Sequence, residues 1–232
     1  MPGTNVEFRS NGSQAAGYLS VPDSGSGPGV VVIQEWWGLV DHIRDICDRL
    51  SAAGFVALAP DLYHGETTAE PDEAGKMMME LDIERAARDM SGAVDYLLGH
   101  DAVDGDKVGA IGFCMGGALV LVLAARNGEK VGAVAPFYSA FAGEVPDLSG
   151  IEAPVLGHFG ELDDFAPPEK ARDLEDTIRE QAGVEVTFHI YKGAGHAFCN
   201  DSRPEAHHPQ HAARAWELTL QFLRGNLEKS PV

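Results

Sequence analysis

The sequence contains few cysteines, and this excludes a fold held together by a disulfide framework. The three that are present, Cys47, Cys114 and Cys199, are an odd number and lie far apart in a chain of 232 residues. None of them forms a pair with the short spacing of zinc ligands. Isolated free thiols are typical of a reducing compartment. We therefore expect a cytoplasmic protein without a cysteine-bound metal.

Long hydrophobic runs are also absent. No segment approaches the roughly 20 apolar residues of a membrane helix, and the N-terminal MPGTNVEFRS lacks the apolar core of a secretory signal. Hydrophobic residues make up 44% of the chain, which is ordinary globular content and enough for a sizeable core. We expect a soluble protein that forms one domain over residues 1–232 and has no membrane partner.

Basic residues are scarce relative to acidic ones. The chain has 17 Lys and Arg against 36 Asp and Glu, a formal net charge of −19. Nucleic-acid binding needs clusters of Lys and Arg, so this balance argues against a nucleic-acid partner. A local basic patch can still bind an anionic small molecule, because salt screens surface charge beyond roughly 8 Å.

Short apolar runs alternate with amphipathic segments along most of the chain. An antiparallel pair opens it, and further buried strands are expected near residues 29–34, 55–60, 107–113, 131–138, 154–160 and 184–191. Helical patterns lie between these strands from the third strand onward. This alternation predicts an α/β fold with a doubly wound, mostly parallel sheet of about eight strands and helices on both faces. Residues 60–80 are the longest irregular stretch and the best candidate for a lid.

The segment GAIGFCMGGAL places a thiol, Cys114, where a strand is expected to end and a helix to begin. Gly112 and Gly116 flank the thiol, and a Cβ at either position would collide with the neighbouring chain in a sharp turn. Such a turn presents one side chain at a helix N-terminus, where the dipole favours a thiolate. We interpret Cys114 as a nucleophile; the alternative is a small buried residue that packs strand against helix.

An acid and a histidine follow the thiol in the order that hydrolases with such a turn require. Asp163 and Asp164 come directly after the expected strand at 154–160, and His196 lies in a Gly-rich turn after the last strand. Each residue alone could be an ordinary loop residue. Their joint placement at strand ends favours a triad in which His196 handles the thiol proton and the acid fixes the imidazole tautomer.

A carboxylate and two tryptophans follow the first buried strand. Glu35 ends this strand, where an ionised carboxylate is costly unless it has a partner. It could accept the thiol proton or form a salt bridge with a nearby Arg, and the residues leave both open. The backbone N–H groups of Trp36 and Met115 are candidates for an oxyanion hole. Trp36 and Trp37 are candidates for a pocket wall, and packing in the core is an equally natural role for one of them.

The chain resembles the dienelactone hydrolase family of the α/β-hydrolase superfamily over nearly its whole length. The resemblance is carried by the segments VVIQEWWGLVDHIRDICDRLSAAGFVALAPDLYHG, KVGAIGFCMGGALVL, HFGELDDFAPP and YKGAGHAFCNDSRP. A cysteine in the elbow is a specific feature, because most of the superfamily carries serine there. The resemblance implies a single α/β-hydrolase domain.

The resemblance also implies an activity and a set of residues for it. It implies cysteine-dependent hydrolysis of enol-lactones or activated esters through an acyl-thioester, without a metal or an organic cofactor. By resemblance, Cys114 is the nucleophile, His196 completes the triad, and Glu35 takes the thiol proton when substrate binds. The pattern G-x-x-D-x-F-x-P selects Asp163 rather than Asp164 as the acid.

Two departures from the family pattern bear on the substrate. The aromatic-degrading members carry an Arg four residues after the histidine, where this chain has Asn200, and the nearest basic residue is Arg203. They carry a second Arg in the lid helix, where this chain has Lys76 and three methionines. Arg203 and Lys76 are therefore candidate substrate-binding residues. Two further candidates are Tyr138, which follows the apolar run VGAVAPF, and Trp37. The expected partner is a small lactone or ester; a monomer is expected, with a dimer left open.

The sequence is compatible with three other interpretations. A general carboxylesterase or thioesterase would share the chemistry but have no role in aromatic catabolism. A non-catalytic binding protein could use the same scaffold. A metal site could use His207 and His211 with His196 nearby, but Pro209 is expected to begin the last helix, so the first two need not share a face.

Overall fold

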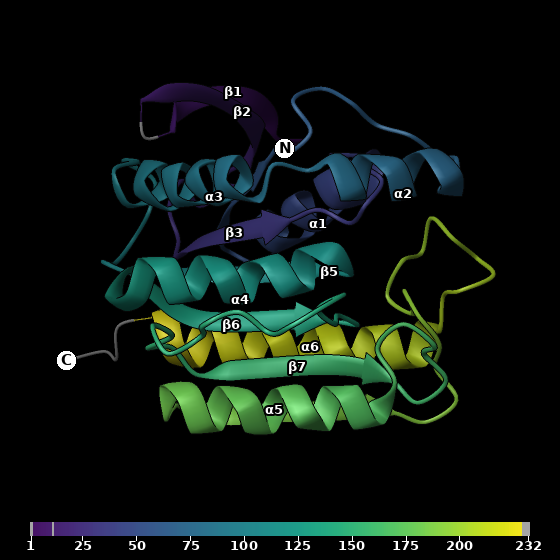
Figure 1. Cartoon of the computed structure of the whole chain (residues 1–232). Helices are drawn as coiled ribbons and strands as arrows, with labels where there is room; N and C mark the ends of the chain where they lie inside the picture. Colours follow the sequence, from purple (N-terminus) through teal and green to yellow (C-terminus); the bar gives the residue numbers. More distant parts are fainter. Residues whose placement is uncertain (1, 11, 229–232) are drawn as a thin grey trace.

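A computed structural model describes residues 2–10 and 12–228 and shows a single mixed sheet with helices against it (Figure 1). Within these residues the sheet has eight strands in the order β1-β2-β4-β3-β5-β6-β7-β8. The strands are β1 (Thr4–Ser10), β2 (Ser13–Ser20), β3 (Gly29–Ile33), β4 (Val56–Pro60), β5 (Val108–Phe113), β6 (Val131–Phe137), β7 (Val155–Gly160) and β8 (Val186–Tyr191).

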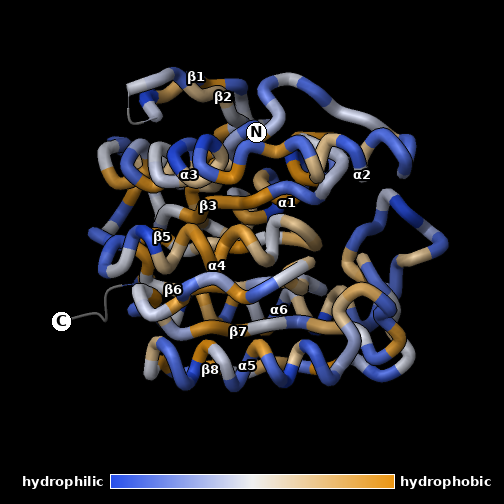
Figure 2. The backbone as a smooth tube through the Cα atoms, in the orientation of Figure 1, coloured by the Kyte–Doolittle hydropathy of each residue, from blue (hydrophilic) through white to orange (hydrophobic). Residues whose placement is uncertain are grey.

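The strand directions confirm the expected mostly parallel sheet. β1 pairs antiparallel with β2, and β2 pairs antiparallel with β4. All the remaining neighbours, from β4 through β3 to β8, are parallel. Every residue of β3 to β7 is buried, as expected for parallel strands covered on both faces. Figure 2 shows β3 and β7 as largely apolar stretches within the fold.

The helices cover the two faces of this sheet. They are α1 (Asp41–Ala52), α2 (Pro71–Glu80), α3 (Ile83–Leu98), α4 (Met115–Asn127), α5 (Pro168–Ala182) and α6 (Pro209–Leu227), with a short 3₁₀ helix at Gly128–Lys130. Alternate residues of β3 face opposite ways, as a pleated strand requires. Val31 and Ile33 join the core formed with α3, α4 and α5. Val30 and Val32 join the core formed with α1 and α6.

The region at 60–80 is less irregular than expected. Helix α2 begins at Pro71, a residue that suits the first turn of a helix because its missing N–H would have no partner there. The segment after it forms a separate helix, α3, whose N-cap Asp82 accepts a hydrogen bond from the Arg85 N–H at 3.0 Å. Ala74 is the buried residue of α2. The structure therefore gives this region a loosely packed helix.

The topology brings several loops to one edge of the sheet. Because β3 and β5 to β8 are parallel, the residues that follow them lie at the same edge. Within residues 2–10 and 12–228, no helix combines the length and the apolar character that a membrane crossing needs.

Candidate active site

The thiol of Cys114 lies at a strained turn between β5 and α4. The strand ends at Phe113, the helix begins at Met115, and Cys114 between them has φ 55° and ψ −119°. A positive φ is unfavourable for a residue with a side chain and is found mostly where a site requires it. Its N–H donates to the carbonyl of Phe137 on the neighbouring strand at 3.0 Å. The thiol is partly exposed, so the turn presents it outward.

The glycines beside the thiol permit this turn, as the sequence predicted. A Cβ on Gly112 would lie 2.1 Å from the carbonyl oxygen of Gly116. A Cβ on Gly116 would lie 2.4 Å from the Gln34 oxygen and 2.5 Å from the Ile33 oxygen. Both distances are far shorter than a real carbon–oxygen contact. The start of α4 therefore touches the end of β3, and only glycine fits between them.

The structure brings Asp163 and His196 together from the loops after β7 and β8. The Nδ1 atom of His196 lies 2.8 Å from Oδ2 of Asp163. The other carboxylate oxygen accepts the N–H groups of Phe165 at 2.8 Å and Ala166 at 3.0 Å. Asp163 is buried and its orientation is fixed by three donors. This leaves Nε2 as the ring nitrogen of His196 that is free to meet the thiol.

The electrostatics of His196 favour its charged form. Burial alone would lower the pKa of His196, but the hydrogen bonds to Asp163 and Cys114 and their charges raise it to about 10. Burial would raise the pKa of Asp163, and its bonds to His196 and to two backbone N–H groups lower it overall. The contacts with Asp163 and Cys114 therefore favour the protonated form of His196.

Glu35 is buried, and in the described part of the chain no hydrogen bond or ion pair joins it to a cationic side chain. It is 1% exposed. Its Oε2 accepts the amide of Asn200 at 2.8 Å, and its Oε1 accepts the Tyr138 hydroxyl at 3.3 Å. Burial and then the charge of Glu35 raise the pKa of Tyr138, so the phenol stays a donor. The sequence left two partners open for Glu35, an Arg and the Cys114 thiol. Within residues 2–10 and 12–228, neither of them forms a hydrogen bond with Glu35.

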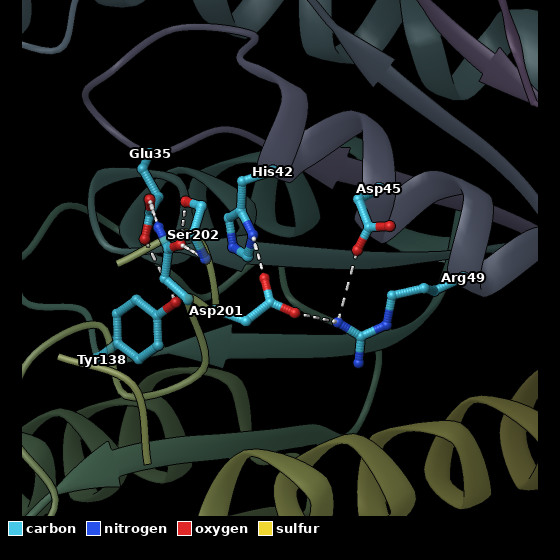
Figure 3. Close-up of polar contacts among 8 residues, drawn as sticks. Glu35, His42, Asp45, Arg49, Tyr138, Asp201 and Ser202 are labelled. Carbon is cyan, nitrogen blue, oxygen red and sulfur yellow. Dashed lines mark hydrogen bonds and ion pairs between the residues drawn. The ribbon is translucent and has the colours of Figure 1, made fainter. Parts of the chain in front are cut away.

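The loop after His196 is fixed to α1, as Figure 3 shows. Asp201 lies 3.4 Å from Nδ1 of the buried His42 and 3.9 Å from the Arg49 guanidinium. The side-chain oxygen Oδ1 of Asn200 accepts the Ser202 hydroxyl at 2.6 Å and the Ser202 N–H at 3.1 Å, so the NH₂ group of the same amide faces Glu35. Sequence reasoning missed these contacts, because nothing local in the sequence pairs residue 200 with residue 35.

Two backbone donors lie where an oxyanion hole is expected. The N–H groups of Trp36, after β3, and Met115, at the first turn of α4, have no hydrogen-bond partner in the described part of the chain. Unpaired N–H groups are uncommon in folded proteins unless a ligand or water satisfies them.

A cavity of about 550 Å³ opens in front of the thiol. Its volume is within the range of small-molecule sites. Cys114, Tyr138 and Ala197, which line it, all have positive φ. The wall includes most of the predicted site residues: Glu35, Trp36, Trp37, Cys114, Met115, Tyr138, His196 and Arg203. It also includes Phe165, which the sequence pattern used only to place Asp163, and Lys170 on α5, which belongs to no motif.

Lys76 is not brought to this cavity. Its side chain is 69% exposed on α2, and its Nζ lies 3.9 Å from Glu80, one helical turn away. Helical spacing of four residues directs these two side chains to each other along the outer surface. The cations that line the cavity are instead Arg203 and Lys170.

The C-terminal histidines do not form a cluster with other ligands. In residues 2–10 and 12–228 there is no group of three or more His, Cys, Asp or Glu side chains that could hold a metal ion. His211 bonds to the Lys192 carbonyl at 2.9 Å, and its ring stacks on His208 at 4.0 Å between centroids.

Comparison with known proteins assigns the chain to a family. The model of the dienelactone hydrolase family matches residues 15–227. "Protein usf" of Aquifex pyrophilus is 36% identical over 96% of this chain and 98% of its own. A protein of Aquifex aeolicus, named provisionally as a carboxymethylenebutenolidase, is 35% identical over 97% of this chain and 100% of its own.

Solved structures agree with this assignment. A dienelactone hydrolase-like promiscuous phosphotriesterase from metagenomic libraries superposes with a TM-score of 0.86 at 25% identity, covering 97% of this chain and 98% of its own. An acylaminoacyl peptidase of Pyrococcus horikoshii shares the fold at a TM-score of 0.74 and 14% identity, over 99% of this chain and 42% of its own. The chain belongs to the dienelactone hydrolase family and is an ester or lactone hydrolase with the α/β-hydrolase fold.

Proposed function

We propose that this chain, as a single domain and without a cofactor, hydrolyses enol-lactones or activated esters with Cys114 as nucleophile. The observation that carries the proposal is His196, bonded through Nδ1 to the buried Asp163 while its pKa is raised by both Asp163 and Cys114. A thiolate paired with an imidazolium is a nucleophile ready at neutral pH. The elbow and the order of the three residues along the chain support the same assignment.

The proposed reaction has two halves. In the first, the sulfur attacks the carbonyl carbon, and the resulting oxyanion accepts the N–H groups of Trp36 and Met115. The carbon–oxygen bond then breaks, and His196 gives its proton to the departing oxygen, which leaves an acyl-thioester on Cys114. In the second half, His196 takes a proton from water, the hydroxide adds to the thioester, and the acid is released with the thiolate restored.

Glu35 is proposed to take the proton of the Cys114 thiol when substrate binds. The support is its burial in the cavity wall and its two neutral donors, Tyr138 and Asn200. A buried carboxylate without a cation lacks the compensation that an ion pair would give. Arrival of a proton on Glu35 would therefore remove a buried charge.

The cavity favours a substrate with apolar and anionic parts. Trp36, Trp37 and Phe165 supply aromatic walls, and Arg203 and Lys170 supply positive charge at a surface that is otherwise strongly acidic. A carboxylated enol-lactone fits this description. The alternative function is that of a general carboxylesterase or thioesterase. Comparing the rates of hydrolysis of a carboxylated dienelactone and of 4-nitrophenyl acetate distinguishes the two functions. A large preference for the lactone supports the first assignment.

The test of the mechanism is a panel of aryl esters and enol-lactones with the wild type, Cys114→Ala and Cys47→Ala. We expect loss of turnover in Cys114→Ala and retention in Cys47→Ala, since Cys47 is a fully buried thiol in the core formed with α1 and α6. Equal turnover by the wild type and Cys114→Ala would overturn the mechanism.

A non-catalytic binding protein makes a different prediction for the thiol. Free cysteine has a pKa of about 8.5 and is mostly protonated near neutral pH. An activated Cys114 should react with iodoacetamide faster than free cysteine at pH 7, whereas a binding protein should show no such acceleration. Peptide mapping of the labelled chain assigns the reacting thiol.

A further inference from the structure

A second cavity lies between α1, α6 and the loop after His196, and we call it the α1–α6 cavity. It has a volume of about 420 Å³, which is within the range of small-molecule sites. None of the residues that line it lines the catalytic cavity. Phe113 and Phe137, which line it, directly precede Cys114 and Tyr138, which line the catalytic cavity. The two cavities therefore share stretches of backbone but no side chain.

The bottom of the α1–α6 cavity is apolar and aromatic. Phe113 and Phe137 are each 1% exposed, and their ring centroids lie 4.7 Å apart. Ile46 of α1 adds apolar surface on one side, and Ala212 and Trp216 of α6 add it on the other. Such a surface is suited to an aromatic group, because ring pairs add to the gain from burial alone.

The rim of the cavity carries three charged side chains without hydrogen bonds in the described part of the chain. Nη1 of Arg49 lies 3.8 Å from Oδ2 of Asp45 and 3.9 Å from Oδ2 of Asp201, which is too long for a hydrogen bond (Figure 3). The guanidinium carbon of Arg49 lies 4.5 Å from the centre of the Trp216 ring. This stacking contact leaves the N–H groups at the edge of the guanidinium available to a ligand.

A buried histidine next to the rim is also without a hydrogen bond. His42 is 5% exposed, and neither of its ring nitrogens has a hydrogen-bond partner among the residues that the structure describes. Its Nδ1 lies 3.4 Å from Oδ1 of Asp201, as Figure 3 shows. A buried polar group without a partner is uncommon in folded proteins. A ligand that fixes Asp201 at the rim would also fix the acceptor that this ring faces.

The charges at the rim favour a ligand that carries both signs. Asp45, Asp201 and Arg49 together have a net charge of −1, because two carboxylates face one guanidinium. A lone anion would compete with the two carboxylates for Arg49, and a lone cation would leave the guanidinium without a hydrogen bond. A zwitterion offers a carboxylate that accepts two parallel hydrogen bonds from the guanidinium. It also offers an ammonium that can donate to the two carboxylates beside it.

We propose that the α1–α6 cavity is a binding site for a free aromatic α-amino acid. The α-carboxylate lies on Arg49, and the α-ammonium lies between Asp45 and Asp201. The aromatic side chain enters the cavity and packs on Phe113 and Phe137. This site is separate from the catalytic cavity and does not depend on the proposed mechanism of hydrolysis.

The test titrates three ligands into the wild type by calorimetry at pH 7. They are phenylalanine, 2-phenylethylamine, which lacks the carboxylate, and 3-phenylpropionate, which lacks the ammonium. We expect phenylalanine to bind at least about tenfold more tightly than either analogue, because each analogue loses one set of charge-assisted hydrogen bonds.

Four variants assign the contacts. Arg49→Met should weaken phenylalanine and 3-phenylpropionate by about tenfold and leave 2-phenylethylamine unchanged, whereas Asp45→Asn should weaken phenylalanine and 2-phenylethylamine and leave 3-phenylpropionate unchanged. Ala213→Trp, at an exposed position of α6 that lines the cavity, should abolish binding of all three. The matched control is Ala52→Trp, at an exposed position of α1 that lines neither cavity, and it should bind phenylalanine like the wild type.

Three binding results would overturn the proposal. They are no binding of phenylalanine to the wild type, no advantage of phenylalanine over its two analogues, and equal binding to the wild type and Ala213→Trp. Phenylalanine should also not compete with 4-nitrophenyl acetate for hydrolysis, and competition that persists in Ala213→Trp would place the amino acid in the catalytic cavity instead. The titration needs no turnover, so it tests this site whether or not Cys114 is the nucleophile.

Discussion

Individual residues around the cavity adopt backbone conformations that side chains normally avoid. Cys114 has φ 55°, Ala197 has φ 59° and Tyr138 has φ 37°. Each follows or lies close to the carboxyl end of a parallel strand, where the chain must turn at once to bring a group to the cavity. Such conformations cost about 1–3 kcal/mol each and persist where the surrounding packing enforces them. The packing at this edge of the sheet therefore offsets the unfavourable backbone conformations of these three residues.

Gly116→Ala tests this packing. The added methyl would meet the backbone oxygens of Ile33 and Gln34 at 2.5 Å and 2.4 Å, and backbone cannot move aside easily. We expect a loss of about 1–3 kcal/mol in unfolding free energy. The matched control is Gly225→Ala in α6, which meets nothing within 4 Å and should stabilise by roughly 0.5–1 kcal/mol. Urea denaturation of both variants measures the change in unfolding free energy, which should be a loss for Gly116→Ala and a gain for Gly225→Ala. Equal changes in the two variants would contradict the close contact at Gly116.

Asp163→Asn tests the electrostatic role of the buried carboxylate. The change removes the negative charge and the acceptor that help raise the pKa of His196 to about 10. The pKa of His196 should fall, so the imidazolium is lost at a lower pH than in the wild type. NMR titration of the His196 ring measures this shift, and kcat/KM should fall by roughly 10³–10⁴. An unchanged His196 pKa would show that Asp163 does not govern the imidazole.

Secondary-structure elements differ in how firmly they are held. Eight of the 13 residues of α4 are buried, whereas α2 buries Ala74. Helix α2 nevertheless contributes Pro71 and Met78 to the catalytic cavity. An element with few buried contacts opens more readily than one in the core, so α2 is the part of the cavity wall most easily displaced.

Hydrogen exchange followed by mass spectrometry tests this difference between the helices. Backbone amides of α2 should exchange faster than those of α4, because opening α2 exposes little apolar surface. A saturating product analogue should slow exchange in α2 more than in α4. Equal protection of the two helices in the free protein would mean that α2 is anchored by contacts other than its own burial.

At the scale of elements the sequence was informative, because buried parallel strands are continuous apolar runs. GVVVI, VALAP and VGAIGF are recognisable as strands without any tertiary information. Cys114, Asp163 and His196 could be proposed as a group because they lie in the segments that follow three of the strands. The partner of Glu35 could not be predicted from the sequence, because Asn200 lies 165 residues away and only the fold brings it to Glu35. Lys170 was missed because no motif marks it, although the fold brings it to the cavity.

At the scale of the whole molecule, a strong negative charge surrounds a core that contains a fully buried histidine, His158. His158 in β7 is fully buried, with its ring nitrogens 2.9 Å from the Tyr191 hydroxyl and 3.0 Å from the Thr219 hydroxyl. Burial, and then the neighbouring His189, lower the pKa of His158 to about 3. The folded protein therefore resists protonation at a site that the unfolded chain protonates near pH 6.5.

Acid should destabilise the fold through His158. Between pH 6.5 and pH 3 the unfolded chain binds a proton there that the folded protein does not, so the unfolding free energy falls as pH falls, by up to roughly 1.4 kcal/mol per pH unit. Denaturant melts of the wild type and His158→Asn from pH 7 to pH 4 measure this slope. The variant should be less stable at pH 7 but show a shallower decline; an identical slope would assign acid sensitivity to other groups.

The most direct test of the proposed mechanism is to detect the acyl group that the substrate leaves on Cys114. The wild type is mixed with excess 4-nitrophenyl acetate, quenched with acid within the first turnovers, and examined by intact-mass spectrometry and peptide mapping. The account predicts one added acetyl group on the chain, carried by the peptide that contains Cys114 and absent from Cys114→Ala. An acetyl group on another residue, or continued turnover with an unmodified Cys114 and an active Cys114→Ala, would contradict it.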